Sequence, residues 1–292
     1  MPCGIIIIDK PAGWTSQDVA AKLRGVFRER RVGHGGTLDP MATGVLPIFI
    51  GRATRGVEFF ESAEKEYIAG LRLGLTTNTQ DTTGEVLDEQ PVSVTGEQLR
   101  EILTKFLGKQ EQVPPMYSAV KIGGKKLYEL ARQGKTVERK ARAIEIKELE
   151  LLDGEGCEFR IRVRCSKGTY VRTLCHDIGQ ALGCGGCMSS LRRTMAGTYR
   201  LAQAVTMDEL LRQEDPEALL LPVDSLFAEY PAHTVQDNQL KAVFNGAAVK
   251  AAGLPDGTYR VYDRNGTFLL VGQAEKGMLK TVKSFFEVKT GE

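Results

Sequence analysis

In the second half of the chain, hydrophobic residues alternate strictly with arginines over the seven residues Phe159-Arg-Ile-Arg-Val-Arg-Cys165. Successive side chains of a β-strand point to opposite faces of the sheet. The pattern therefore predicts a strand with one face on a core and a cationic opposite face. The core side chains are expected to be Phe159, Ile161, Val163 and Cys165.

Other short segments predict further strands and the loops between them. Residues 4–9 contain four consecutive isoleucines, which is typical of a strand buried on both faces, and 45–50 and 67–73 are also expected to be strands. Residues 76–88 are mostly polar and predict a surface loop. The segment 32–40 is too rich in glycine for a regular element and ends in a proline, so it is expected to be a loop of fixed shape.

Three helices are predicted from caps and apolar spacing. Ser16 is expected to cap the first helix, whose apolar side contains Val19, Leu23, Val26 and Phe27. Thr95-Gly-Glu-Gln98 fits a capping box, and the apolar positions after it predict a helix that Gly108 ends. A turn at 166–168 leads into the third helix, with Val171, Leu174, Ile178 and Leu182 on its buried face.

The C-terminal part of the chain differs in texture from the rest. Beyond about Ala232 the sequence consists of short strands and turns, and Asn265-Gly266 lies between two strand-like runs. An Asn-Gly pair in that position predicts a β-hairpin. In a chain of 292 residues this leaves room for a compact β domain of about 60 residues after a larger first domain.

Charge is unevenly distributed, although the net charge of the chain is only +2. The segment 118–147 contains nine lysines and arginines against three glutamates. Such a segment suits a nucleic-acid partner, whose affinity depends on contacts between cations and phosphates. A solvated charged face is the alternative interpretation. No apolar run approaches the roughly 20 residues of a membrane span, and the first residues lack a basic leader, so we expect a soluble cytoplasmic protein with no membrane partner.

The cysteines and histidines predict no metal site. Cys184-Gly-Gly-Cys187 has the C-x-x-C spacing of zinc ligands, and His176 is close to it in sequence. A structural zinc ion needs four ligands, however, and no second pair follows. Six cysteines scattered over a chain of this length are expected to be reduced thiols.

The glycine-rich loop contains the strongest candidate for chemistry. Its spacing fits neither a P-loop nor a dinucleotide fingerprint, so a nucleotide cofactor is not expected. The loop does contain a carboxylate, Asp39, near His34 and Thr37. A turn aspartate before proline is the alternative. Tyrosines near arginines, Tyr67, Tyr117, Tyr128 and Tyr170, suit stacking on an unstacked RNA base, or else half-buried packing.

Four motifs in order give the chain a resemblance to a known family. They are Lys10-Pro-Ala-Gly-Trp-Thr-Ser16, Gly33-His-Gly-Gly-Thr-Leu-Asp-Pro-Met-Ala-Thr-Gly44, Ser166-Lys-Gly-Thr-Tyr-Val-Arg-Thr173 and Leu191-Arg-Arg193. Together they resemble the bacterial TruB family of tRNA pseudouridine synthases, which modify uridine 55 in the T loop of tRNA. The resemblance implies an isomerase that needs no cofactor or metal.

The resemblance also implies an architecture. The fold is expected to be α+β, with a central mixed, mainly antiparallel sheet flanked by helices and loops, followed by a small PUA-like β-barrel. The catalytic domain would span 1–228, with an RNA-clamping insertion at about 115–147, and the RNA-binding domain would span 229–292. The expected partner is the T arm of tRNA, and the protein is expected to act as a monomer with no obligate protein partner.

Residue roles follow from the resemblance motif by motif. Asp39 matches the aspartate that attacks the uridine, and Arg172 matches its ion-paired cation, which is expected to lower the pKa of Asp39. Tyr67 matches the tyrosine that stacks on the flipped base. His34 matches the residue that fills the space this base leaves in the T loop.

The remaining matched residues are expected to bind substrate or support the site. Tyr170 and Leu191 resemble residues that line the pocket, and Lys10 resembles a motif lysine with a largely structural role. Lys125 and Lys126, in the insertion, are expected to contact tRNA. A tRNA-folding chaperone that acts on the T arm without catalysis is the alternative function.

The chain departs from the family pattern at two places. Gly35 stands where the family usually has threonine, which predicts a more flexible loop and a weaker placement of His34. Gly185-Gly186-Cys187 replaces a Gly-Ala pair followed by histidine or tyrosine, which predicts altered packing at the end of a helix.

Overall fold

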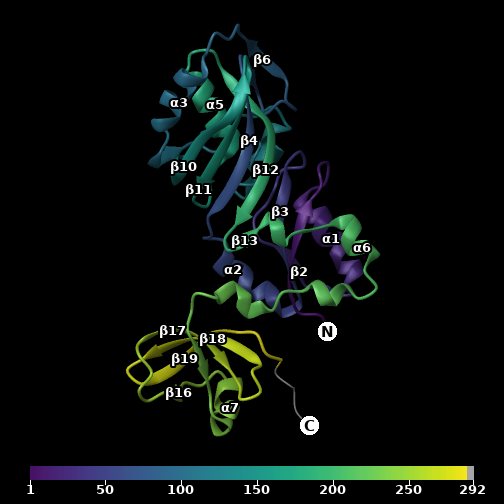
Figure 1. The fold of residues 1–292 in the computed structure, drawn as a ribbon, viewed down its shortest axis with the longest axis vertical. Helices are drawn as coiled ribbons and strands as arrows, with labels where there is room; N and C mark the ends of the chain where they lie inside the picture. The colour runs from purple at the N-terminus through teal and green to yellow at the C-terminus, as the bar shows by residue number, and fades with distance from the viewer. Residues whose placement is uncertain (288–292) are drawn as a thin grey trace.

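A computed structural model describes residues 1–287 and contains two main sheets, of ten and five strands, besides two small hairpins. Figure 1 shows the larger one in the upper and middle parts of the molecule and the smaller one, formed by the C-terminal segment, at the lower end. The larger sheet contains, in spatial order, β14 (Val205–Thr206), β1 (Gly4–Lys10), β3 (Thr43–Ile50), β12 (Gly186–Ala196), β4 (Lys65–Leu73), β11 (Glu158–Cys165), β10 (Arg142–Glu155) and β7 (Gly108–Gln112), with β2 (Val32–His34) paired to β3 and β13 (Tyr199–Arg200) paired to β12.

The larger sheet is mixed and mainly antiparallel, as predicted. Only β1 with β14 and β12 with β3 pair in parallel. Helices α1 (Ser16–Val26), α3 (Gly96–Thr104), α5 (Val171–Ala181) and α6 (Met207–Arg212) pack on it. The short helices are η1 (Gly51–Gly56), α2 (Val57–Phe60), α4 (Leu127–Ala131), η2 (Leu201–Gln203), η3 (Pro216–Leu219) and η4 (Val223–Phe227).

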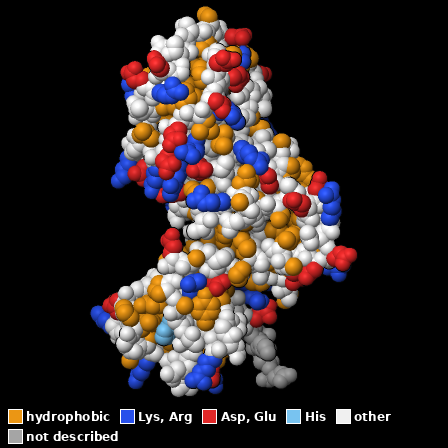
Figure 2. All heavy atoms as spheres, in the orientation of Figure 1, with side chains coloured by type: hydrophobic (Ala, Val, Ile, Leu, Met, Phe, Trp, Pro, Cys, Tyr) orange, Lys and Arg blue, Asp and Glu red, His pale blue; other side chains and the backbone are white. Residues whose placement is uncertain are grey.

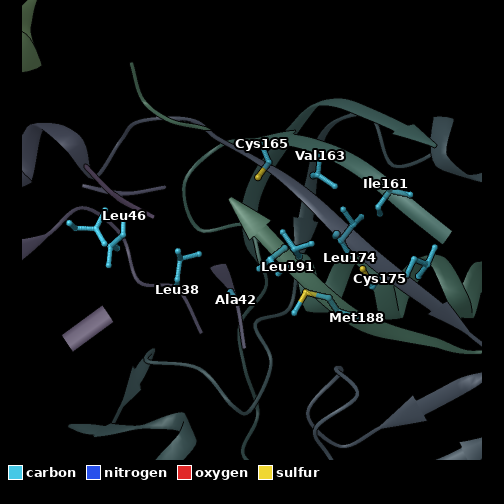
Figure 3. Close-up of a cluster of buried hydrophobic side chains, with 14 of the residues drawn as sticks. Leu38, Ala42, Leu46, Ile161, Val163, Cys165, Leu174, Cys175, Met188 and Leu191 are labelled. Carbon is cyan, nitrogen blue, oxygen red and sulfur yellow. The ribbon is translucent and has the colours of Figure 1, made fainter. Parts of the chain in front are cut away.

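The main core lies between the sheet and these helices. Leu23 of α1, Leu103 of α3 and Leu174 of α5 are all buried in it. Figure 3 shows how side chains that are distant in sequence meet in this core. Those labelled come from the loop before β3 (Leu38, Ala42), from β3 (Leu46), from β11 (Ile161, Val163, Cys165), from α5 (Leu174, Cys175) and from β12 (Met188, Leu191).

The predicted alternation in β11 is confirmed, but its polar face is not simply cationic. Phe159, Ile161, Val163 and Cys165 are all buried. The three arginines pair with acidic residues on neighbouring segments: Arg160 with Asp153, Arg162 with Glu150, and Arg164 with Glu148 and Glu64. Figure 2 shows red and blue side chains interleaved over β10 and β11. The arginine charges are therefore balanced on this face.

Several predicted boundaries were wrong by a few residues. Thr15, not Ser16, caps α1, because its hydroxyl accepts a hydrogen bond from the Asp18 amide. The capping box at Thr95 is confirmed, but α3 ends at Thr104, before Gly108. The glycine-rich segment begins with strand β2, which pairs with β3 through Val32–His34.

The polar segment 76–88 is not only a surface loop. It is part of a hairpin of β5 (Leu75–Thr77) and β6 (Val86–Glu89), and the turn between them buries Asp81. The basic segment 118–147 also contains several regular elements. It forms a small hairpin of β8 (Lys121–Ile122) and β9 (Lys125–Lys126), then α4, and its last residues belong to β10 of the larger sheet.

The C-terminal sheet has its own core and docks on the larger part through aromatic side chains. Its spatial order is β15 (Ala232–Thr234), β17 (Gly257–Tyr262), β18 (Phe268–Glu275), β19 (Met278–Ser284) and β16 (Val249–Lys250), with α7 (Asp237–Phe244) alongside. The predicted hairpin around Asn265-Gly266 is confirmed by the β17–β18 pair. Phe227 contacts Phe268 and Phe285, and the Arg52 side chain donates to the Phe285 carbonyl at 2.8 Å.

Candidate active site

A cleft of about 1000 Å³ lies where the loop after β2 meets β4, β12 and the start of α5. The β5–β6 turn and the segment leading into α4 complete its walls. Six of the predicted site residues line it: His34, Asp39, Tyr67, Tyr170, Arg172 and Leu191. Residues that lie as far apart in the sequence as His34 and Leu191 thus line the same cleft.

Asp39 and Arg172 form an ion pair in this cleft. The Arg172 Nε lies 2.9 Å from the Asp39 Oδ2, and the Arg172 Nη2 donates to the Asp39 Oδ1 at 3.3 Å. The Arg172 side chain is 8% exposed, whereas that of Asp39 is 36% exposed. One hydrogen bond and one close ion contact, on different carboxylate oxygens, restrict the carboxylate plane as well as its position. The pair therefore holds an accessible carboxylate in one orientation.

Asp81, which the sequence reasoning missed, lies on the other side of Arg172. Its Oδ2 is 3.6 Å from the Arg172 Nη1, and its side chain is 7% exposed. Its Oδ1 accepts hydrogen bonds from the hydroxyls of Thr79 and Thr83 and from the Thr83 amide. The carbonyls of Thr79 and Tyr117 also accept from the guanidinium, at 3.3 and 2.9 Å. Arg172 is thus held on several sides.

The pKa of Asp39 is raised, contrary to the expected net lowering. Burial in the cleft is the largest cause, and the nearby Asp81 charge acts in the same direction. Arg172 and Lys10 lower the pKa of Asp39, as expected for neighbouring cations, but less than burial raises it. The guanidinium therefore offsets part of the cost of keeping this carboxylate charged.

The turn between β1 and α1 holds the loop that contains Asp39. Lys10 is fully buried, and its Nζ donates to the carbonyls of Pro11, Trp14 and Pro40 at 2.8, 2.6 and 3.3 Å. The Ser16 hydroxyl accepts from the Leu38 amide at 2.8 Å. These bonds hold the residues on both sides of Asp39, so Lys10 supports the loop. Lys10 does not line the cleft.

Tyr67 and Leu191 form an apolar wall of the cleft. Tyr67 lies on β4 and pairs in register with Val163 of β11 and Arg193 of β12. Burial raises the pKa of the Tyr67 hydroxyl, so this phenol stays neutral at physiological pH. Leu191 is 9% exposed and belongs to the main core (Figure 3).

Two buried cations beside this wall were not predicted as site residues. The Arg193 side chain is almost fully buried, and it donates to the carbonyls of Val45 at 2.7 Å and Gly36 at 3.1 Å. The Lys65 Nζ donates to the Ala63 carbonyl at 2.6 Å, and burial lowers the pKa of Lys65 to about 8. Arg193 was visible only as part of the Leu191-Arg-Arg193 motif, and Lys65 gave no sequence signal.

His34 stands at the end of β2 and reaches the cleft. Its Nδ1 is buried without a hydrogen-bond partner among the described residues, and burial lowers the pKa of its imidazole. Next to it, a Cβ on Gly35 would lie 2.6 Å from Phe60 and 3.1 Å from Phe49. The ring of Phe60 therefore fills the space that a side chain at position 35 would need.

The basic insertion reaches the cleft through α4. Tyr128 and Arg132 line the cleft, and the Arg132 guanidinium lies 5.4 Å from the centre of the Tyr128 ring. Lys125 and Lys126 form β9 next to this helix and do not line the cleft. The Lys126 Nζ lies 3.3 Å from the Tyr128 hydroxyl.

The two cysteines of the C-x-x-C motif lie in the interior of the protein. Cys184 and Cys187 are buried free thiols, and burial raises the pKa of Cys187 to about 11. Over residues 1–287 no group of three His, Cys, Asp or Glu side chains is arranged to hold a metal ion. None of the helices in that part of the chain has the length and apolar character that a membrane span requires.

Comparison with known proteins identifies relatives over almost the whole chain. The protein named tRNA pseudouridine synthase B from Stutzerimonas stutzeri is 45% identical over 280 residues, which cover 94% of this chain and 92% of that protein. The protein of the same name from an Azoarcus species is 44% identical and covers 99% of this chain and 96% of its own length.

Solved structures show the same architecture. A Cbf5-Nop10-Gar1 complex contains a chain that matches with a TM-score of 0.73 and 27% identity, covering 97% of this chain and 85% of that one. An H/ACA RNP bound to a substrate RNA containing 2'-deoxyuridine contains a chain that matches with a TM-score of 0.72 and 26% identity, with the same coverage.

Three family models match consecutive parts of the sequence. The N-terminal domain of the TruB family pseudouridylate synthases matches residues 24–171, and the C-terminal domain of tRNA pseudouridylate synthase B matches 172–228. A third, the C-terminal part of pseudouridine synthase II TruB, matches 231–282. Together with the relatives above, these matches show that the chain belongs to the TruB family of pseudouridylate synthases.

Proposed function

We propose that this protein is a tRNA pseudouridine synthase that isomerises uridine 55 in the T loop. The observation that supports this most directly is the Asp39–Arg172 pair, which presents an oriented carboxylate in a cleft of about 1000 Å³. The relatives that cover nearly the whole chain have the name tRNA pseudouridine synthase B. A cleft of this volume falls at the upper end of the range for small-ligand sites and has room for one nucleotide.

The proposed chemistry uses the carboxylate as a nucleophile and conserves every atom of the substrate. The Asp39 carboxylate attacks C1′ of the target nucleotide, and the bond between C1′ of the ribose and N1 of uracil breaks, with its electron pair leaving on the uracil ring. The released ring rotates, and C5 attacks C1′, which breaks the bond between C1′ and Asp39 and returns the free carboxylate. C5 loses its proton to solvent and N1 gains one, so the reaction is an isomerisation and uses no oxidant or cofactor.

The cleft walls suit a base that has left its stack. An enzyme that acts on a base inside folded RNA must take it out of the stack and enclose it. We assign Tyr67 to stacking on the uracil ring and Leu191 and Tyr170 to lining its pocket. We assign His34, whose Nδ1 is unpartnered among residues 1–287, to filling the space that the base leaves.

RNA binding is proposed to extend beyond the cleft. Lys125 and Lys126 stand on β9 beside the cleft-lining helix α4, where they can reach phosphates of the T arm. The catalytic domain is proposed to span 1–228, and the C-terminal sheet, in 229–292, to be a PUA-like RNA-binding module. The protein is proposed to bind tRNA as a monomer.

Asp39→Asn is the variant that tests this function. The substrate is a tRNA transcript that contains uridine labelled with tritium at C5, because formation of pseudouridine releases that hydrogen to water. The wild type is expected to release tritium, and Asp39→Asn is expected to bind the transcript with similar affinity and release none. A transcript with cytidine at position 55 serves as the substrate control.

Each result bears on one part of the proposal. Tritium release by Asp39→Asn would exclude the carboxylate as nucleophile, and undiminished release from the cytidine-55 transcript would exclude position 55 as the target. Failure of the wild type to release tritium, combined with acceleration of tRNA folding, would instead favour the chaperone function.

A further inference from the structure

Helix α5, which begins just before Arg172, lacks the side-chain cap that usually fixes a helix start. Its N-cap residue is Tyr170, whose own side chain makes no capping hydrogen bond. The first amides and the residue before them are the least constrained part of an isolated helix. Arg172 is the second residue of this helix, so its position depends on how Tyr170 is held.

Gln112 holds the backbone of Tyr170 from a different part of the chain. Its Oε1 accepts from the Tyr170 amide at 2.8 Å, and its Nε2 donates to the Tyr170 carbonyl at 3.1 Å. Gln112 is the last residue of β7, at the edge of the larger sheet, and is 5% exposed. A primary amide that engages both backbone groups of one residue fixes that residue's orientation as well as its distance.

The segment after Gln112 also contacts Arg172 directly. Five residues later, the Tyr117 carbonyl accepts from the Arg172 Nη2 at 2.9 Å. Ser166, at the start of the turn before α5, is tied to β10, because its amide donates to the Glu145 carbonyl at 2.9 Å. The turn is thus anchored at its start by β10 and at its end by Gln112.

We propose that Gln112 is a positioning residue for Arg172, because its amide clamps Tyr170 and thereby fixes the first turn of α5 against the loop that contains Asp39. The inference rests on the proposed function, since its effect is read through pseudouridine formation. Gln112 does not line the cleft. Loss of the clamp lets the guanidinium move relative to the carboxylate.

The test compares two glutamines on the same strand. Gln112→Met keeps the side-chain length and removes both hydrogen bonds to Tyr170. Gln110→Met makes the same change two residues earlier, where the amide donates to the nearby Phe106 carbonyl and has no other partner among residues 1–287. We expect Gln112→Met to lower the single-turnover rate of tritium release by between about 10-fold and about 100-fold, as for a catalytic group displaced by up to about 1 Å. Gln110→Met is expected to stay near the wild-type rate.

A merely structural role would lower stability without changing the rate for tRNA that is already bound. The dissociation constant for tRNA of Gln112→Met is therefore expected to match that of Gln110→Met. Its melting temperature is expected to be lower, because the Tyr170 amide and carbonyl lose their partner, so the rates are compared at a temperature where both variants are folded. Gln112→Glu keeps an acceptor for the Tyr170 amide and is expected to regain part of the rate. Equal single-turnover rates for the two methionine variants, or a decrease confined to tRNA affinity, would overturn the proposal.

The pH dependence supplies a second readout. The charged or titratable groups that face Asp39 are Arg172, Asp81, Lys10 and Tyr67, and of these only Arg172 belongs to α5. A looser Arg172 lowers the pKa of Asp39 less, so the acidic limb of the rate profile is expected to move to higher pH in Gln112→Met. An unmoved limb would contradict the proposal. An inactive wild type would refute the proposed function, whereas an active wild type with equal variants would refute the role of Gln112 alone.

Discussion

A comparison of Ser16→Ala with Thr15→Ala distinguishes a loss of helix stability from a loss of the position of Asp39. Ser16 is 1% exposed, and its hydroxyl accepts from the Leu38 amide at 2.8 Å and donates to the Leu38 carbonyl at 3.3 Å. Removal of the hydroxyl leaves the buried Leu38 amide without this partner, which costs about 1–3 kcal/mol. Because Leu38 precedes Asp39, the same change frees the loop that contains the carboxylate.

Thr15→Ala is the matched control, because it removes the α1 cap without touching Leu38. Its expected cost is similar, about 0.5–2 kcal/mol. Urea unfolding, followed by the fluorescence of the sole tryptophan, Trp14, measures both decreases in stability. Single-turnover tritium release then separates the variants, and we expect the rate of Ser16→Ala to fall at least about 10-fold below that of Thr15→Ala. Equal rates in the two variants at comparable stability would refute this reasoning.

Three further outcomes follow from the charges around the cleft. Asp81→Asn removes a negative charge that raises the pKa of Asp39, so the acidic limb of the rate profile should move to lower pH; a limb that moves upward would contradict this. Burial lowers the pKa of Lys65 from 10.5 to about 8. Between these two pH values the unfolded chain binds more protons than the folded protein, so the free energy of unfolding rises with pH. Urea unfolding at pH 8 and pH 10 should therefore show a smaller rise in Lys65→Met than in the wild type. Replacing both Lys125 and Lys126 by glutamine should weaken tRNA binding and lower the salt slope by about 1 for each phosphate that these lysines neutralise, and unchanged binding across salt concentrations would count against their role.

Local patterns predicted the elements of this fold well, because each depends on neighbours in sequence. The alternation over 159–165 and the capping box at Thr95 both reappear in the structure. The sequence did not show what faces the β11 arginines, since Arg164 pairs with Glu64, 100 residues earlier. A strand whose arginines are unpaired and a strand whose arginines pair with acidic residues elsewhere have the same local sequence.

The candidate site shows the same division. The motifs identified Asp39 and Arg172, and the structure brings them together across 133 residues. Asp81 stayed hidden because a segment rich in threonine, aspartate and glycine has the composition of an exposed turn. Gln112 was equally hidden, since nothing in the local sequence distinguishes a buried amide that reaches across to another element from the exposed amides nearby.

The ion-paired arginines of β11 also affect where on the protein surface a polyanion can bind. Each positive charge on this face is accompanied by a carboxylate from β10 or from the segment before β4. If the basic insertion binds tRNA as proposed, an RNA that first touches the β11 face would meet as much repulsion as attraction and would dissociate quickly, because only unbalanced cations release counterions from phosphates. Encounters with the basic insertion would last longer. The balanced face would thus favour productive orientations by shortening the lifetime of the others.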